Sequence, residues 1–195
     1  ATEKAVFLVD PLAVTDISSL GLLLSDPGIR KVFHGADYDI RSLHRDFSLE
    51  VRNLFDTMIA CQLLGEKEVG LAAALKKRFG VELDKRYQKA DWSKRPLDPG
   101  MIAYAAGDTS LLVALYRQLE AELAEKGRVF RREAAGLAAE LRSLRTDTAS
   151  KLERDVNRHL ADLAMEECRF SVRLSELEKI RSTGADEVSF TLSAG

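Results

Sequence analysis

The sequence contains little cysteine, no strong charge excess and no long apolar segment. Its two cysteines, Cys61 and Cys168, lie far apart, and nothing in the chain resembles a signal peptide. No uncharged apolar run reaches the length of a membrane helix. These absences predict a soluble protein of the reducing cytoplasm with no membrane partner. The formal net charge of −2 and the isoelectric point near 6.0 exclude a general attraction to nucleic acid, so such binding requires a local patch.

Two further absences concern nucleotides and the start of the chain. No GxxxxGK segment followed by Ser or Thr occurs, so the sequence does not support nucleotide binding. The chain begins at Ala1 without an initiator methionine, and we therefore expect this residue to be a cut end. The 195 residues, 46% hydrophobic and 31% charged, are sufficient for one ordinary core, or for one core with an appendage.

Short apolar runs that alternate with helical periodicities predict an α/β fold in the first two thirds of the chain. Residues 6–9 and 31–34 are expected to be neighbouring strands, and a further short strand is expected at 53–57. The spacing of apolar residues, with Gly or Pro near several ends, predicts the helices. These helices are expected at 17–24, 37–47, 57–64, 70–79, 98–108 and 110–124.

Three polar residues on two of these helices are candidates for chemistry. Asp39 lies in the first turn of the 37–47 helix, at the end of a strand, whereas Tyr104 and Asp108 are spaced i and i+4 on one face of a later helix. Asp39 has a structural alternative, because an acid in a first helical turn also satisfies free N–H groups and the helix dipole. A carboxylate beside a hydroxyl also suits a metal site that acts on water. Asp56 or Thr57 is expected to cap the helix that follows, and Asp56 is interpreted as a capping residue rather than a catalytic one.

The segment from Lys85 to Arg95 differs in composition from its surroundings. Its basic side chains are interleaved with Tyr87 and Trp92 in a stretch too polar to be core. Such a basic and aromatic patch is typical of single-stranded nucleic-acid binding. Solvated charges around a tryptophan anchor would give the same pattern, so the residues alone leave both interpretations open.

Several ordered segments between about residues 5 and 126 resemble the ribonuclease D branch of the 3′–5′ exonucleases. They are LVDPLAV, KVFHGADYDI, LFDTMIACQLLG, GVELDKRYQKADWSKRPL and YAAGD. The resemblance implies a ribonuclease H-like exonuclease core that hydrolyses phosphodiesters at the 3′ ends of RNA or single-stranded DNA. It also implies a two-metal site that uses Mg²⁺ or Mn²⁺.

The resemblance assigns roles to individual residues. Asp39 and Asp108 would be ligands of the metal pair, and Tyr104 would orient the attacking water. The basic and aromatic segment would pack beside the active site and contact nucleic acid. The residues assigned to that contact are Lys85, Gln88 and Arg95.

One part of the family pattern is missing from the sequence. The first motif, Asp-x-Glu on the first strand of the sheet, should lie upstream of the LVDPLAV segment, but the only earlier acid is Glu3. Asp10 belongs to the later LVDPLAV element and cannot substitute for it. We therefore expect residues 1–126 to form a truncated exonuclease domain that lacks its first strands, with an incomplete metal site and impaired hydrolysis.

From Gly127 onward the sequence changes character. Apolar residues at steps of three and four form a narrow stripe along 130–160 on a charged helix, as in a coiled-coil strand. After residue 165 the period becomes two, which predicts a small β-hairpin around a Thr-Gly turn at 183–184. The segments VNRHLADLAMEECRFSVRL and GADEVSFTLSAG resemble the DNA repair protein RecN. Residues 127–195 are therefore interpreted as a RecN-like coiled-coil helix and strand pair.

Two alternatives to the exonuclease come from other classes of function. One is a non-catalytic interaction protein, in which an exposed sheet edge and the unpaired helix drive association. The other is a fragment of a RecN-like DNA repair ATPase. Because the sequence encodes no antiparallel partner for the 130–163 helix, we expect this helix to form a homo-oligomer rather than fold back onto the core.

Overall fold

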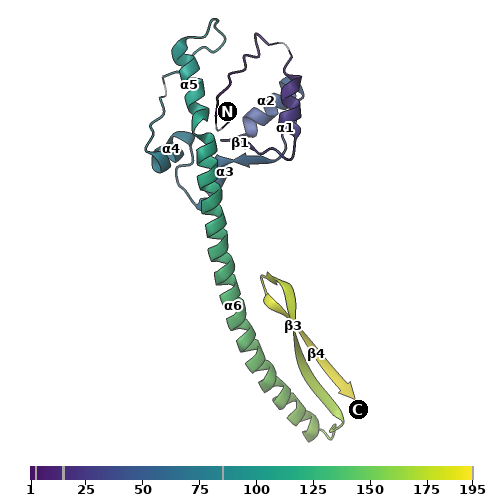
Figure 1. Cartoon of the computed structure of the whole chain (residues 1–195). Coiled ribbons are helices and arrows are strands. Elements are labelled where there is room, and N and C mark those ends of the chain that lie inside the picture. The colour runs from purple at the N-terminus through teal and green to yellow at the C-terminus, as the bar shows by residue number, and fades with distance from the viewer. Residues whose placement is uncertain (3, 15, 85, 195) are drawn as a thin grey trace. The chain divides into compact units, whose positions relative to one another are not determined.

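The computed structural model describes residues 1–2, 4–14, 16–84 and 86–194 and shows a mixed α/β protein (Figure 1). The chain divides into two compact units, Ala1–Lys126 and Gly127–Gly195. The helices of the first unit are α1 (Ser18–Ser25), α2 (Asp37–Phe47), α3 (Thr57–Leu64), α4 (Leu71–Phe79) and α5 (Pro99–Ser110). Its strands are β1 (Lys31–Phe33) and β2 (Leu54–Asp56). Helix α6 (Leu112–Asp162) continues into the second unit, which also contains β3 (Cys168–Arg181) and β4 (Gly184–Ala194).

This element order confirms the predicted fold class, an α/β core followed by a long helix and a small hairpin. In the first unit β1 and β2 are parallel, in the register Lys31↔Leu54 to Phe33↔Asp56. Helix α2 follows β1 after a short turn, and α3 follows β2 directly. Because parallel strands have their carboxyl ends at one edge of the sheet, both helices begin at that edge.

The strand predicted at residues 6–9 is wrong. These residues form no strand and do not pair with β1, and their side chains are exposed, that of Phe7 by 71%. An apolar run has strand propensity, but a strand forms only where its N–H and C=O groups meet a neighbouring chain. A local pattern contains no information about that neighbour.

The hydrophobic core of the first unit lies between α3, α4 and the first part of α6. Its fully buried side chains include Cys61, Leu75, Leu115 and Leu119. The two α6 leucines are four residues apart, so they lie on the same face of the helix. Burial raises the pKa of the Cys61 thiol to about 11, and the thiol therefore stays protonated at neutral pH.

A charged network crosses the edge of this core. The Arg78 side chain is only 3% exposed, and its guanidinium hydrogen-bonds the carboxylates of both Glu66 and Glu122. Lys77 adds a second cation 3.0 Å from Glu66, whose side chain is 8% exposed. The hydrogen bond from Arg78 lowers the pKa of the Glu66 carboxyl from an ordinary value of 4.5 to about 2. This network joins α4 to α6.

We expect Glu66 to make the stability of the first unit depend on pH. Because folding lowers its pKa, the ionised carboxylate stabilises the native state above about pH 4.5, and this contribution is lost as the pH falls toward 2. Urea unfolding should show that wild type has a larger free energy of unfolding than Glu66→Gln near neutral pH. The difference between the two proteins should shrink as the pH falls toward the pKa of Glu66 in the folded state. A difference in free energy of unfolding that does not change with pH would contradict the stabilising role of the Glu66 charge.

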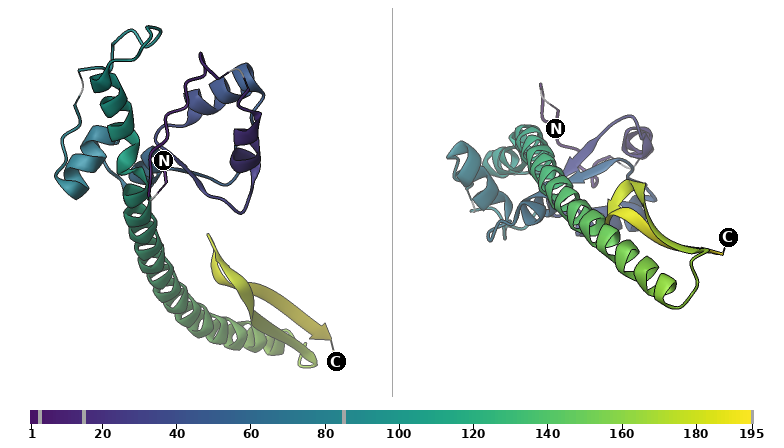
Figure 2. Two further views of the ribbon diagram at one scale, coloured as in Figure 1. Left: turned by 45° about the horizontal axis from the view of Figure 1, so that its top comes forward. Right: turned by 90° about the horizontal axis from the view of Figure 1, so that it is seen from below.

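The second unit consists of most of α6 and the antiparallel hairpin of β3 and β4, which lie side by side (Figure 2). The register runs from Cys168↔Ala194 to Glu176↔Asp186. Gly184 begins β4 with φ of 103°, a conformation that glycine adopts without strain. The predicted hairpin is confirmed, and its strands are longer than the alternating pattern indicated.

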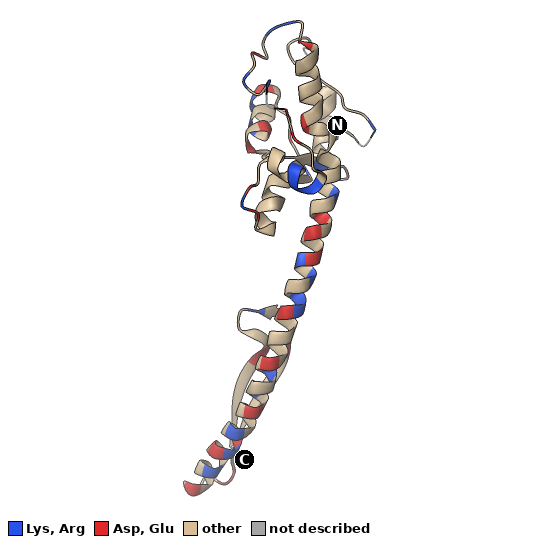
Figure 3. Cartoon of the chain, turned by 90° about the vertical axis from the view of Figure 1, so that its left-hand side faces the viewer, with Lys and Arg blue, Asp and Glu red and all other residues tan. Residues whose placement is uncertain are grey.

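Helix α6 is one continuous helix, whereas the sequence predicted a break within it. Two helices were expected, at 110–124 and 130–163, but one helix spans both. Gly127 lies between them, and a glycine costs an α-helix only about 1 kcal/mol, which does not end it. Both Lys and Arg and Asp and Glu are distributed along the helix (Figure 3). Within the described residues, no helix is both long enough and apolar enough to cross a membrane.

The sequence predicted no antiparallel partner helix for the α6 stripe, and it did not predict that the hairpin lies beside the stripe. Leu141 and Leu152 of α6 line a groove together with Val172 and Val188 of the hairpin. The hairpin therefore covers part of the stripe. A sequence pattern shows that a helix face is apolar, but not which distant element packs against it.

Candidate active site

The turn between β1 and α2 positions Asp39. Gly35 in this turn has φ of 72°, in the left-handed region that favours glycine. Helix α2 then begins at Asp37, so Asp39 lies in its first turn, near the carboxyl end of β1. There Asp39 lines a cavity of about 1070 Å³.

Asp56, at the end of β2, connects the starts of two helices. Its carboxylate accepts hydrogen bonds from the backbone N–H groups of Gly35 at 3.0 Å and Ala36 at 2.8 Å, just before α2. It also accepts one from Met58 in α3 at 2.8 Å, which confirms the predicted cap. Burial alone would raise the pKa of Asp56, but these N–H donors outweigh burial and lower it. Asp56 thus also fixes the helix that carries Asp39.

We expect Asp56→Ala to lower the free energy of unfolding by about 2 kcal/mol, because one cap is worth about 1 kcal/mol and this residue serves two helix starts. Asp98→Ala is the matched control. Asp98 caps only α5, through the N–H of Gly100 at 2.7 Å, so the expected loss is about half as large. Chemical denaturation compares the two variants, and equal losses would contradict the double role of Asp56.

Helix α5 brings Tyr104 and Asp108 to the same cavity as Asp39. One helical turn separates the two residues, as their spacing predicted. The Tyr104 ring lies 6.2 Å from the ring of Tyr87 and 6.1 Å from that of Trp92, between centroids. The aromatic residues of the basic segment therefore surround Tyr104.

The surroundings of Asp39 and Asp108 in the cavity disfavour charge on these two carboxyl groups. Burial raises the pKa of Asp39, and the neighbouring Asp56 carboxylate raises it further. Burial also raises the pKa of Asp108, although the hydrogen bond from the Tyr104 hydroxyl opposes this effect. Burial, together with the Asp108 charge, raises the pKa of Tyr104, which keeps its hydroxyl protonated. A bound cation would stabilise the ionised form of both carboxylates.

These carboxylates suit a divalent cation in type. Asp39 and Asp108 offer the hard oxygen ligands that Mg²⁺ and Mn²⁺ prefer. In the part of the chain that the structure describes, no group of three or more His, Cys, Asp or Glu side chains is arranged to hold a metal ion. The residues present therefore fit part of the ligand set of a two-metal site.

Other residues of the cavity include one predicted contact and several that the sequence interpretation missed. Gln88 lines the cavity, as do Lys31, His34 and Asp84. The Lys31 ammonium donates to two backbone carbonyls, and His34 Nδ1 lies 2.9 Å from the Thr57 hydroxyl. Lys31 lies in β1 and His34 directly follows this strand, which leads to Asp39, so their closeness in the sequence is a signal for their proximity in space. No signal of this kind marked Asp84.

Arg95 does not line this cavity. Its guanidinium makes two hydrogen bonds of 2.6 Å to the Asp10 carboxylate and donates to the carbonyls of Trp92 and Lys94. The hydrogen bonds from Arg95 lower the pKa of Asp10 to about 2. The Arg95 guanidinium therefore connects the basic segment to the loop that contains Asp10, and it does not face the cavity. Lys85, the other basic residue assigned to nucleic acid, lies outside the described residues.

The two carboxylates and the tyrosine that share one cavity of this α/β core offer the oxygen ligands and the hydroxyl group that a metal-dependent hydrolase can use. Residues 1–124 match the 3′–5′ exonuclease family, and the chain belongs to that family. The resemblance of residues 5–126 to exonucleases is thereby confirmed. The family match leaves residues 125–195 outside it.

Individual relatives agree with this assignment. Exosome complex component 10 of Mus musculus is 44% identical over 128 residues, which cover 65% of this chain and 14% of that protein. The structure of Escherichia coli RNase D, an exoribonuclease involved in structured RNA processing, is 34% identical with a TM-score of 0.58, covering 60% of this chain and 32% of that one. Brucella melitensis NrnC with bound Mg²⁺ is 30% identical with a TM-score of 0.52, covering 59% and 56%. The chain thus spans about a seventh of the mouse relative.

Proposed function

We propose that residues 1–126 are a 3′–5′ exonuclease domain of ribonuclease D type that acts on the 3′ ends of single-stranded RNA or DNA. The observation that carries this proposal is that Asp39, Tyr104 and Asp108 line one cavity in a chain of the 3′–5′ exonuclease family. RNA is the first substrate to test, because the related Escherichia coli enzyme is an exoribonuclease.

Each of the three residues has a role in this proposal. Asp39 and Asp108 would hold Mg²⁺ or Mn²⁺, which, when bound, activates water and stabilises charge on the phosphate. Tyr104 would orient the attacking water through its protonated hydroxyl. The Tyr87 and Trp92 rings hold the Tyr104 ring in place.

The nucleic-acid contact is proposed for one wall of the cavity. The Gln88 side chain has both a donor and an acceptor for a nucleotide, and it lines the same cavity as Tyr104. Lys85 would add positive charge for the phosphates. Arg95 is proposed to fix the conformation of this segment through Asp10 rather than to bind nucleic acid.

Binding to linear and circular oligonucleotides of one sequence tests the proposed 3′-end specificity. An exonuclease site requires an end, so the linear RNA should bind more tightly in the presence of Mg²⁺. Gln88→Ala should weaken this binding about fivefold, the equivalent of one neutral hydrogen bond. Gln62→Ala, an exposed glutamine of α3, is the control and should have no effect. Equal affinity for both forms of RNA would contradict the proposal.

We also propose that hydrolysis is impaired in this chain. The support is that the family's Asp-x-Glu motif does not occur upstream of the LVDPLAV segment in this sequence. The residues encoded directly upstream of Ala1 test this point, since an Asp-x-Glu strand there would complete the ligand set.

A second candidate function, a non-catalytic interaction protein, is favoured by the exposure of Phe130, Leu137 and Leu144 on α6, by 56%, 67% and 65%. A homo-oligomer through the 130–163 helix, as in a coiled coil, is one form that such an interaction would take. The assignment of residues 129–195 as RecN-like, with a role in DNA repair, is proposed on the sequence segments alone. A cytoplasmic location is proposed as well. Its support is that both cysteines are free, as is usual in a reducing compartment.

A further inference from the structure

The hairpin of the second unit has two outer edges, and α6 covers one of them. On the outer edge of β3, the Asn157 side chain accepts from the N–H of Phe170 and donates to its carbonyl, both at 2.9 Å. The Glu153 carboxylate accepts from the N–H of Val172 at 2.6 Å. These side chains satisfy backbone groups that would otherwise pair with another strand.

The same hydrogen bonds fix which backbone groups of β4 point outward. Phe170 lies opposite Leu192 and Val172 opposite Phe190 in the ladder. Since the backbone groups of Phe170 and Val172 point away from β4, these are non-hydrogen-bonded pairs, and the N–H and C=O groups of Phe190 and Leu192 point away from β3. By the same alternation, those of Val188 also point outward. The outer edge of β4 therefore presents a regular row of donors and acceptors.

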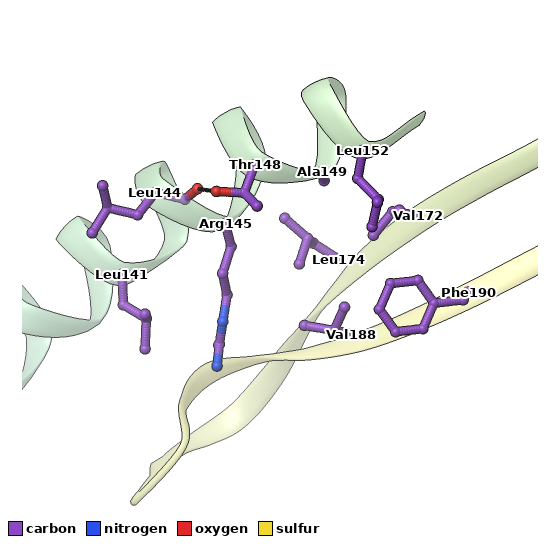
Figure 4. A pocket seen from close by; sticks show the side chains of 10 residues that line it. All are labelled: Leu141, Leu144, Arg145, Thr148, Ala149, Leu152, Val172, Leu174, Val188 and Phe190. Atoms are coloured by element: carbon purple, nitrogen blue, oxygen red, sulfur yellow. Dashed lines mark hydrogen bonds between the residues drawn. The ribbon is translucent and has the colours of Figure 1, made fainter. Parts of the chain in front are cut away.

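The composition of the last seven residues of β4, which follow the charged Asp186 and Glu187, does not discourage pairing. Residues 188–194 include no charge and no proline, which are the usual means of protecting an edge strand. Residues 187–194 are all exposed, Phe190 by 61% and Leu192 by 60%. Val188 and Phe190 also line an apolar groove of about 320 Å³ beside Leu152 of α6 (Figure 4).

We propose that the β4 edge pairs with β4 of a second copy of this chain, antiparallel about a two-fold axis at Phe190. This axis places Phe190 opposite Phe190 and Val188 opposite Leu192 of the other copy. All of these residues have outward backbone groups, so each pair can exchange two N–H···O hydrogen bonds. The product is one continuous sheet in the order β3-β4-β4-β3.

A second copy is the occupant because the edge is complementary to itself. In the proposed register apolar residues meet apolar residues, whereas Ser189 meets Thr191 on the opposite face. No like charges are brought face to face between residues 188 and 192. The apolar side chains of both copies lie on the sheet face that bears the groove, so pairing also shields Val188 and Phe190 from water. This contact does not depend on the proposed nuclease function.

Sedimentation velocity of the full chain tests the pairing. Wild type is expected to dimerise, and Phe190→Lys to weaken the dimer at least about tenfold, because the axis places the two lysines opposite each other. Thr191→Lys is the matched control, since its charge lies on the other face and meets Ser189. Dissociation by Leu137→Asp but not by Phe190→Lys would assign the contact to the α6 stripe and overturn the proposal, as would a monomeric wild type.

Cross-linking keeps the test valid if Phe190→Lys unfolds the hairpin. In a Cys168→Ser background, Phe190→Cys should form an intermolecular disulfide, because directly opposite residues of such a pair are about 5.5 Å apart at Cα. Ser193→Cys should not, because the axis separates its two copies by about six residues of strand, roughly 20 Å. Equal cross-linking of both variants, or none of Phe190→Cys, would overturn the proposed register.

Discussion

Arg78→Ala is expected to lower the free energy of unfolding of the first unit by about 3–5 kcal/mol. The Arg78 side chain is 3% exposed and provides hydrogen bonds to Glu66 and to Glu122. Its loss leaves the Glu66 carboxylate, itself 8% exposed, with only Lys77 as a cation. The large effect therefore comes from the acid that is left behind, since desolvation of an unpaired charge is costly. Urea unfolding followed by circular dichroism measures this loss.

The control for this prediction is an ion pair in solvent. The Arg86 side chain is 81% exposed and pairs with Asp84 within a loop, so Arg86→Ala should change stability by no more than about 1 kcal/mol. Arg78→Ala combined with Glu66→Gln should recover part of the loss, because it also removes the stranded charge. An Arg78→Ala variant as stable as Arg86→Ala would contradict the description of this network.

The second large effect is expected for hydrolysis. The chain should release few or no mononucleotides from 3′-labelled single-stranded RNA with Mg²⁺ or Mn²⁺. Joining an Asp-x-Glu strand to the N-terminus should raise the rate about 1000-fold, because ligands of a two-metal site stabilise the transition state by several kcal/mol. The same extension with Asn-x-Gln is the matched control and should give no gain.

Two outcomes would contradict this prediction. Robust release by the chain alone, abolished by Asp108→Ala, would mean that another acid replaces the missing pair. Equal rates for the Asp-x-Glu and Asn-x-Gln extensions would mean that the carboxylates of the added strand have no catalytic role.

Much of the first unit could be predicted from the sequence because its signals are local. The spacing of Ile40, Leu43 and Phe47 after Gly35 predicted α2 at the bounds that the structure shows. Asp56 predicted the start of α3 through its capping chemistry. The prediction of a strand at residues 6–9 was wrong because a strand depends on a neighbouring chain segment, which a local sequence pattern does not specify.

Contacts between distant residues could not be predicted from these patterns. Arg95 has the positive charge expected of a residue that binds nucleic acid, but it donates its hydrogen bonds to Asp10, which lies 85 positions away in the sequence. The α6 stripe had the spacing of a coiled coil, yet Asn157 and Glu153 of that helix bind the edge of β3. In both cases the side-chain chemistry was visible in the sequence and its partner was not.

The central claim is that Asp39 and Asp108 form a divalent-metal site, and titration with Mn²⁺ followed by electron paramagnetic resonance tests it most directly. Wild type should bind Mn²⁺ saturably, and both Asp39→Asn and Asp108→Asn should lose this binding. Asp37→Asn is the control, because Asp37 lies in the same helical turn as Asp39 but its side chain is 81% exposed and pairs with Arg41. The account predicts that this variant binds Mn²⁺ as wild type does. Unchanged binding in Asp39→Asn and Asp108→Asn would contradict it.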